Sequence, residues 1–232
     1  MNAFDMIVNF FKQGGAFLYP IAAVFAVGLG FAVERFIYLH RVAKGNRRLW
    51  AELAPLIKAG NFRKAMELAE QTDSALSTVM RYGMSRIATA QRREDIEKAM
   101  EESLIEVIPH LEKRTHYLAT LANVGMLMGL LGTVIGLINA FAAVNPAEKA
   151  AMLSASISVA MNNTALGLCL AITLLLCHMY LETKTTELVD SLEVASIKFL
   201  NSITERRQAV AEPASAAASA RVTEKILRAA RA

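Results

Sequence analysis

The chain of 232 residues is too apolar for an ordinary soluble domain, because 54% of its residues are hydrophobic, only 20% are charged and the mean hydropathy is +0.35. This composition predicts an all-α membrane protein. The net charge of +4 comes with no nucleic-acid-binding motif. The two cysteines, Cys169 and Cys177, lie together in one apolar run, a pattern that suggests neither a metal site nor a secreted disulfide framework.

The amino-terminal part predicts an interfacial segment followed by a first membrane span. Residues 1–13 are amphipathic and rich in Phe, which is typical of a helix lying at the membrane surface. A signal peptide is the rival interpretation, but Asp5 precedes the first cation, Lys12, and no basic region opens the chain. We expect the first transmembrane helix at 14–39, with Pro20 in its first turns, where proline is tolerated.

Residues 40–117 alternate charged and apolar positions and contain no membrane-length run, so they predict a water-facing helical block. Helices are expected at 63–71, 75–90 and 93–118, the last one bent at Pro109 and continuing into the membrane. Ala59-Gly60-Asn61 predicts a turn, and Asp73-Ser74 a helix cap.

The second span, expected at 118–144, carries a stripe of glycines. Its apolar core of about 23 residues is about 34 Å long as a helix, enough to cross a bilayer. The glycines are spaced four, three and four residues apart and lie on one face, where a neighbouring helix can approach closely. They are Gly125, Gly129, Gly132 and Gly136. Thr133 lies near the middle of this span.

The third span, expected at 151–181 after a short external turn at 145–150, is polar in its first half. Ser154, Ser158 and Asn162 recur every four residues and should face protein or water rather than lipid. Two interpretations stay open: packing of helices through small residues and amide hydrogen bonds, or a hydrated pathway.

The carboxyl-terminal part predicts an amphipathic helix at 182–208 and a flexible, low-complexity tail at 209–232. Lys and Arg gather in 35–114 and after Lys184, whereas Lys12 and Lys149 stand alone in the other two connecting segments. The positive-inside rule then places the amino terminus outside and the large polar block and the carboxyl terminus in the cytoplasm.

Two motifs carry a resemblance to a known family. MGLLGTVIGLINAF, at 128–141, resembles the GLLGTVxGMIxxF signature of the MotA/TolQ/ExbB proton channel family. Asn163-Thr164-Ala165-Leu166-Gly167 is similar to the ATAIG segment of the last span in this family, and Gly167 is an expected helix-packing residue. Three spans resemble the ExbB and TolQ branches rather than flagellar MotA.

The resemblance implies a homo-oligomeric, pentameric ring in the bacterial inner membrane, working with a single-span partner similar to ExbD or TolR. It implies a subunit that uses proton motive force to energise TonB- or Tol-dependent envelope transport. Thr133 and Thr164 match the two threonines that face the pore in the family, and a hydroxyl group can both donate and accept a hydrogen bond. We add Ser158 and Asn162 as candidate residues of the ion pathway.

One departure from the family concerns the proton carrier. The family motif has a glutamate five residues before its threonine, and this chain has Val159 there. Between Leu118 and Leu181 the only acidic residue is Glu148, in the external turn. Hydroxyl and amide groups do not titrate in the accessible pH range, so we expect the carboxylate to come from the partner. Whether protons or sodium ions flow stays open.

No catalytic set, cofactor motif or metal-ligating pattern is found in the sequence, and no enzymatic activity is expected. A lone histidine such as His178, near Tyr180 and Glu182, is more often an interfacial residue than a titrating one. Two hypotheses remain: an ion-driven motor subunit, and a non-conducting oligomeric scaffold for envelope or secretion proteins.

Overall fold

The computed structural model describes residues 15–87, 89–90, 92–142 and 149–229, and every helix or strand among them is an α-helix. The helices are α2 (Leu18–Ala59), α3 (Phe62–Gln71), α4 (Ala75–Arg86), α5 (Arg93–Glu112), α6 (Thr115–Phe141) and α7 (Lys149–Ala229). Apolar stretches long enough to cross a membrane occur in α2, α6 and α7, so the chain is a multi-pass membrane protein.

The chain divides into two compact units. The membrane unit comprises Met1–His40 and Glu112–Thr186, and the polar unit comprises Arg41–Leu111 and Glu187–Ala232. Because α2 and α7 are longer than a membrane span, each of them contributes one part to each unit.

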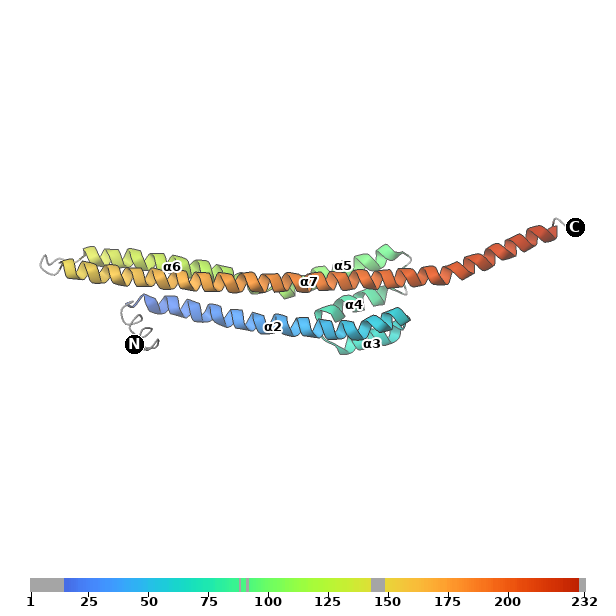
Figure 1. The fold of residues 1–232 in the computed structure, drawn as a ribbon, viewed down its shortest axis with the longest axis horizontal. Coiled ribbons are helices and arrows are strands. Elements are labelled where there is room, and N and C mark those ends of the chain that lie inside the picture. The colour runs from blue at the N-terminus through green and yellow to red at the C-terminus, as the bar shows by residue number, and fades with distance from the viewer. Residues whose placement is uncertain (1–14, 88, 91, 143–148, 230–232) are drawn as a thin grey trace. The chain divides into compact units, whose positions relative to one another are not determined.

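In the membrane unit, α2 and α7 run in the same direction and α6 runs in the opposite one (Figure 1). Gly28 of α2 lies against Leu174 of α7, and further along both helices Phe36 stacks on Tyr180 with 6.0 Å between the ring centres. This order of contacts gives α2 and α7 the same direction.

Contacts between α2 and α6 lie near the beginning of α6. The rings of Phe31 and Tyr117 are 6.2 Å apart, and Glu34 forms an ion pair with Arg114. The membrane unit is therefore a three-helix arrangement in which α6 and α7 form an antiparallel pair, with α2 beside them.

The polar unit has a well-packed core. Gly83 of α4 allows Met100 of α5 and Phe199 of α7 to approach, so that three helices meet at this point. The apolar face of the amphipathic helix expected at 182–208, which is part of α7, is buried there, as are the apolar positions of α5. Core residues from these helices include Leu76, Val79, Met80, Ile96, Met100, Leu104, Leu192, Ala195, Phe199 and Ile203.

Two local predictions in the polar unit, the turn at Gly60 and the helix cap at Ser74, are confirmed. The Gly60 φ angle is +72°, a left-handed conformation that suits glycine, and the turn there separates α2 from α3. Ser74 begins α4 with a capping box, since its side chain accepts from the Ser77 backbone N–H and Ser77 Oγ accepts from the Ser74 backbone N–H. Asn46 of α2 adds a second link, because its Oδ1 accepts from the Leu76 backbone N–H.

Two expected segment boundaries are wrong. The helix expected to run through 93–118 ends at Glu112, and α6 starts at Thr115, so the break lies at Lys113-Arg114 rather than at Pro109. Arg114 has a φ angle of +71°, which no α-helix accommodates. The expected tail at 209–232 is also different, since α7 continues as helix to Ala229. The expected interfacial segment 1–13 and most of the turn at 145–150 lie outside the described residues.

Candidate functional site

The glycine stripe of α6 lies directly against α7. A Cβ atom placed on Gly129 would be 3.1 Å from Gly167 Cα and 3.2 Å from the Asn163 carbonyl oxygen. A Cβ on Gly167 would be 2.8 Å from Gly129 Cα. The two backbones therefore touch, because both helices lack a side chain at the same level.

The other glycines follow the same interface. Cβ atoms added to Gly132 and Gly136 would meet the side chains of Asn163 and Ala160, each at 2.7 Å. At the other end of the stripe, a Cβ on Gly125 would meet Leu170. As the residue number rises along α6 it falls along α7, so the pair is antiparallel.

The two candidate threonines both hydrogen-bond to carbonyl groups of α6. Thr164 Oγ1 donates to the Gly129 carbonyl oxygen over 3.0 Å and so links the two helices. Thr133 Oγ1 donates to the Leu130 carbonyl oxygen of its own helix over 2.5 Å. Both threonine side chains are half-buried in the single chain.

Thr133 and Thr164 lie on the same flank of the α6–α7 pair. Gly132 and Asn163 face each other at the interface, and each threonine follows directly in sequence. One residue turns an α-helix by about 100°. Because the helices are antiparallel, the same turn brings both hydroxyl groups to one side of the pair.

Asn162 lies on the opposite flank, because it precedes Asn163. Tyr180 follows Asn162 by about five full turns of helix and thus shares its face. Since Tyr180 stacks on Phe36, this is the flank that α2 covers. Ser158 is turned further away from α6 and is exposed. The structure therefore brings the two threonines together and separates them from Ser158 and Asn162.

Asn163 is the residue that sequence reasoning did not single out. Its side chain is 2% exposed, and its Oδ1 atom has no hydrogen-bond partner among the described residues. A buried amide oxygen without a partner is unfavourable in an apolar setting, and it is available to accept a hydrogen bond. The sequence did carry a signal, because Asn163 stands where the ATAIG segment of the family has its first alanine.

The chemistry of this site is that of hydrogen bonds without titration. Thr133, Thr164 and Asn163 supply hydroxyl and amide groups, and no carboxylate of α6 or α7 lies among them in the described spans. The described residues also contain no group of three or more His, Cys, Asp or Glu side chains that could hold a metal ion. The site can order water or bind a carboxyl group, but it cannot itself carry a proton.

Comparison with known sequences points to one family. The sequence model described as the MotA/TolQ/ExbB proton channel family matches residues 71–194, slightly more than half of the chain. The matched region contains all of α6 and the part of α7 that pairs with it.

Three relatives agree with this match. An ExbB homolog from Methanothermobacter thermautotrophicus is 26% identical over 195 residues, which cover 84% of this chain and 69% of the relative. The Tol-Pal system protein TolQ of Haemophilus influenzae is 40% identical over 77 residues, 32% of this chain and 34% of the relative. The biopolymer transport protein ExbB of Pseudomonas putida is 26% identical over 162 residues, covering 63% and 49% respectively.

Proposed function

The chain belongs to the MotA/TolQ/ExbB proton channel family, in its ExbB/TolQ-like branch, and on this basis we propose that it is an ion-driven motor subunit of the bacterial inner membrane. In this proposal several copies form a ring, five in number as in the family. The ring energises TonB- or Tol-dependent envelope transport with an ExbD- or TolR-like single-span partner.

The observation that carries the proposal is the shared flank of Thr133 and Thr164. The two hydroxyl groups lie on the side of the α6–α7 pair away from α2, so the third helix of the same chain does not cover them. Because the glycines of the stripe have no side chains, α6 and α7 lie close together at this level. A ring built from such pairs would present a band of hydroxyl groups to a central space.

The proposal also accounts for the apolar surface that a single chain leaves open. Large side chains along α6 and α7 are exposed to a degree that requires lipid, further copies or a partner helix to cover them. They include Met126, Leu130, Val134, Leu137, Phe141, Met161, Leu168 and Ile172.

The partner supplies the titrating group in this proposal. The membrane spans of α6 and α7 contain no acidic residue, so a carboxylate on the partner helix would bind and release the proton beside Thr133 and Thr164. One proton crossing 100 mV releases about 2.3 kcal/mol, which is available for moving the partner. The Lys- and Arg-rich segments support a polar unit in the cytoplasm and an amino terminus in the periplasm.

The test combines mass measurement with ion flux. The full chain is copurified with a single-span partner, its assembly mass is measured, and proton uptake is followed in liposomes under a potassium diffusion potential. We expect Thr133→Val and Thr164→Val to lower the flux at least about tenfold while the assembly mass stays the same, since losing an interaction worth about 1.4 kcal/mol changes a rate tenfold.

Thr173→Val is the matched control. Thr173 lies about two and a half turns after Thr164, on the opposite side of α7, and its Oγ1 donates to the Cys169 carbonyl oxygen of the same helix. It should keep full flux. Full flux in both pathway variants would refute the role of the threonines, and an assembled wild-type ring without flux would favour the non-conducting scaffold.

A further inference from the structure

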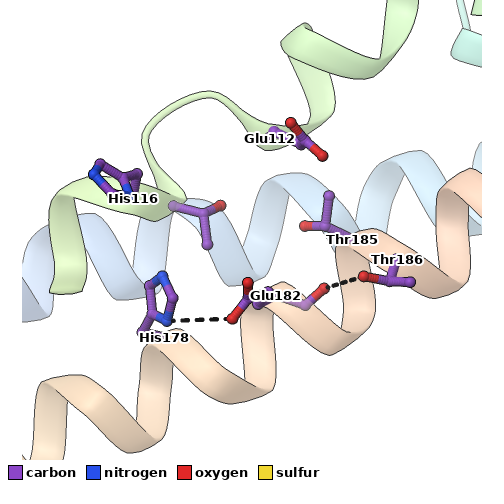
Figure 2. A pocket seen from close by; sticks show the side chains of 7 residues that line it. Glu112, His116, His178, Glu182, Thr185 and Thr186 are labelled. Atoms are coloured by element: carbon purple, nitrogen blue, oxygen red, sulfur yellow. Dashed lines mark hydrogen bonds and ion pairs between the residues drawn. The ribbon is translucent and has the colours of Figure 1, made fainter.

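A second polar site lies in the membrane unit, away from the two threonines. Seven residues line a pocket of about 250 Å³, and they come from the chain that leads into α6 and from α7 (Figure 2). Thr164 and His178 are separated by about 21 Å along α7, so this pocket is distinct from the candidate ion pathway. The lining residues are Glu112, Thr115, His116, His178, Glu182, Thr185 and Thr186.

The pocket contains two imidazoles and two carboxylates. His178 Nδ1 lies 3.5 Å from Glu182 Oε2. Figure 2 marks this pair with a dashed line, and His116 and Glu112 line the same space from the other side. With both histidines neutral, the pocket carries two negative charges that repel each other. A proton on either imidazole creates an ion pair and removes part of this repulsion.

Thr115 is an independent observation, because it is a polar group of the pocket wall whose hydrogen-bonding capacity is not used. Its side chain is 6% exposed, and Oγ1 has no hydrogen-bond partner among the described residues. By contrast, Thr185 Oγ1 donates to the Leu181 carbonyl oxygen and Thr186 Oγ1 to that of Glu182. One buried hydroxyl group in the pocket wall is therefore available to water or to a neighbouring carboxylate.

The pocket lies at the break between α5 and α6. Glu112 ends α5, Thr115 begins α6, and Arg114 between them has the left-handed conformation and pairs with Glu34 of α2. No residue of α2 lines the pocket among the described residues. The charged and titratable groups of α2 at this level are Glu34, Arg35 and His40, and Lys184 of α7 lies over the Tyr180 ring.

We propose that this pocket is a proton-binding latch, in which a proton taken up by His178 or His116 pairs with Glu182 and Glu112 and holds the α5–α6 link on α7. The proposal goes beyond ion conduction, because it rests on the pocket alone and does not require the chain to form a channel. Loss of the proton restores the repulsion between the two carboxylates and loosens the link.

Hydrogen exchange of the full chain in detergent tests the latch. The protection of amides in 112–118 is measured at pH 6 and pH 8 and corrected for the intrinsic exchange rate. We expect the protection to be about two- to fivefold higher at pH 6, the size of effect that a partly exposed ion pair gives. In the double variant His116→Gln/His178→Gln, and in Glu182→Gln, the dependence on pH should disappear.

His110→Gln is the control. His110 lies in α5, outside the pocket, and its Nδ1 lies 3.1 Å from the Glu106 carbonyl oxygen of the same helix. It should keep the wild-type dependence on pH. Unchanged protection of 125–136 shows that each variant is folded. Equal protection of the link at both pH values in the wild type, or a full pH dependence in His116→Gln/His178→Gln, would overturn the proposal.

Discussion

Thr164 of α7 donates a hydrogen bond to the backbone carbonyl of Gly129 on α6, over 3.0 Å between Oγ1 and the carbonyl oxygen. The bond is possible because Gly129 and Gly167 have no side chains, which lets the two backbones approach to contact distance. The same hydroxyl group thus links the two helices and lies on the flank that α2 leaves uncovered. Its packing role and its proposed pathway role can be separated by experiment.

Replacing Thr164 by Val removes the hydroxyl group and keeps the branched shape. We expect a loss of about 1 kcal/mol in the free energy of unfolding, the usual size of a hydrogen bond between membrane helices. Thr164→Ser, which keeps the donor, should lose less. Reversible unfolding in mixed detergent micelles, followed by circular dichroism, measures the difference, and equal stability of the two variants would contradict the link between α6 and α7.

Gly167→Ala tests the close approach of the helices. The new Cβ would lie 2.8 Å from both the Gly125 carbonyl oxygen and Gly129 Cα, which are backbone atoms, so the helices must separate. We expect a destabilisation of about 1–3 kcal/mol, as for overpacking. Gly30→Ala is the control, because a Cβ there meets nothing within 4 Å. If both variants unfold alike in the same assay, the interface is not as close as described.

The helical architecture of the membrane unit followed from the sequence, whereas the flank of each polar residue did not. Length and hydropathy are enough to predict three spans, and all three are found. The sequence assigns Ser158, Asn162 and Thr164 to one polar region, because it does not show which side of the third span faces the first span. The contact of Phe36 with Tyr180, which shares a helix face with Asn162, puts Asn162 on the flank of α2 and Thr164 on the other flank.

The two wrong boundaries have separate physical causes. The expected tail is rich in alanine, which is the strongest helix former. The prediction of a flexible tail rests on its low complexity and leaves the helix propensity of alanine out of account. The break before α6 occurs at Arg114, whereas left-handed residues at such positions are usually Gly or Asn. No composition signal marks that position, and the pairing of Arg114 with Glu34 comes from a distant part of the chain.

Asn46→Ala tests the link between α2 and α4. Asn46 is 5% exposed and its Oδ1 accepts from the Leu76 N–H over 3.2 Å, so truncation leaves a buried donor without a partner. We expect a loss of about 1–3 kcal/mol in the stability of the polar unit. The single tryptophan, Trp50, packs against the core of this unit and reports its unfolding by fluorescence in urea.

Asn61→Ala is the matched control for this substitution. Asn61 is exposed at the start of α3, and its side chain makes no capping hydrogen bond. Its replacement should change the midpoint of the Trp50 transition little. Equal shifts for the two asparagine variants would show that the bond from Asn46 to α4 does not stabilise the unit.

Alkaline pH should weaken the polar unit through Tyr82. The hydrogen bond that Tyr82 Oη donates to Glu106 Oε2 raises the pKa of the tyrosine above its ordinary value, with a further contribution from the charge of that carboxylate. The folded state therefore holds the proton more tightly than the unfolded state. The resulting stability is present below the tyrosine pKa of the unfolded chain, and it is lost as the pH rises through the pKa of the folded chain.

The measurement compares wild type with Tyr82→Phe in urea at pH 8 and at higher pH, using Trp50 fluorescence. The wild type should be the more stable of the two at pH 8, and the difference should shrink at alkaline pH. The two proteins differ only at Tyr82, so every other contribution is common to both and cancels in the comparison. A difference that stays constant across this range would refute the contribution of the Tyr82 hydrogen bond.

The conformation of Arg114 predicts that glycine is preferred over alanine at this residue but not at the neighbouring Lys113. Arg114→Gly and Arg114→Ala both remove the ion pair with Glu34, but only glycine adopts a φ angle of +71° without steric cost. Arg114→Gly should therefore be more stable than Arg114→Ala by about 1 kcal/mol. At the neighbouring Lys113, which has no positive φ angle, the glycine variant should gain no such advantage over alanine. Reversible unfolding in mixed micelles provides both comparisons. If Arg114→Ala is as stable as Arg114→Gly, the link between α5 and α6 does not require the left-handed conformation.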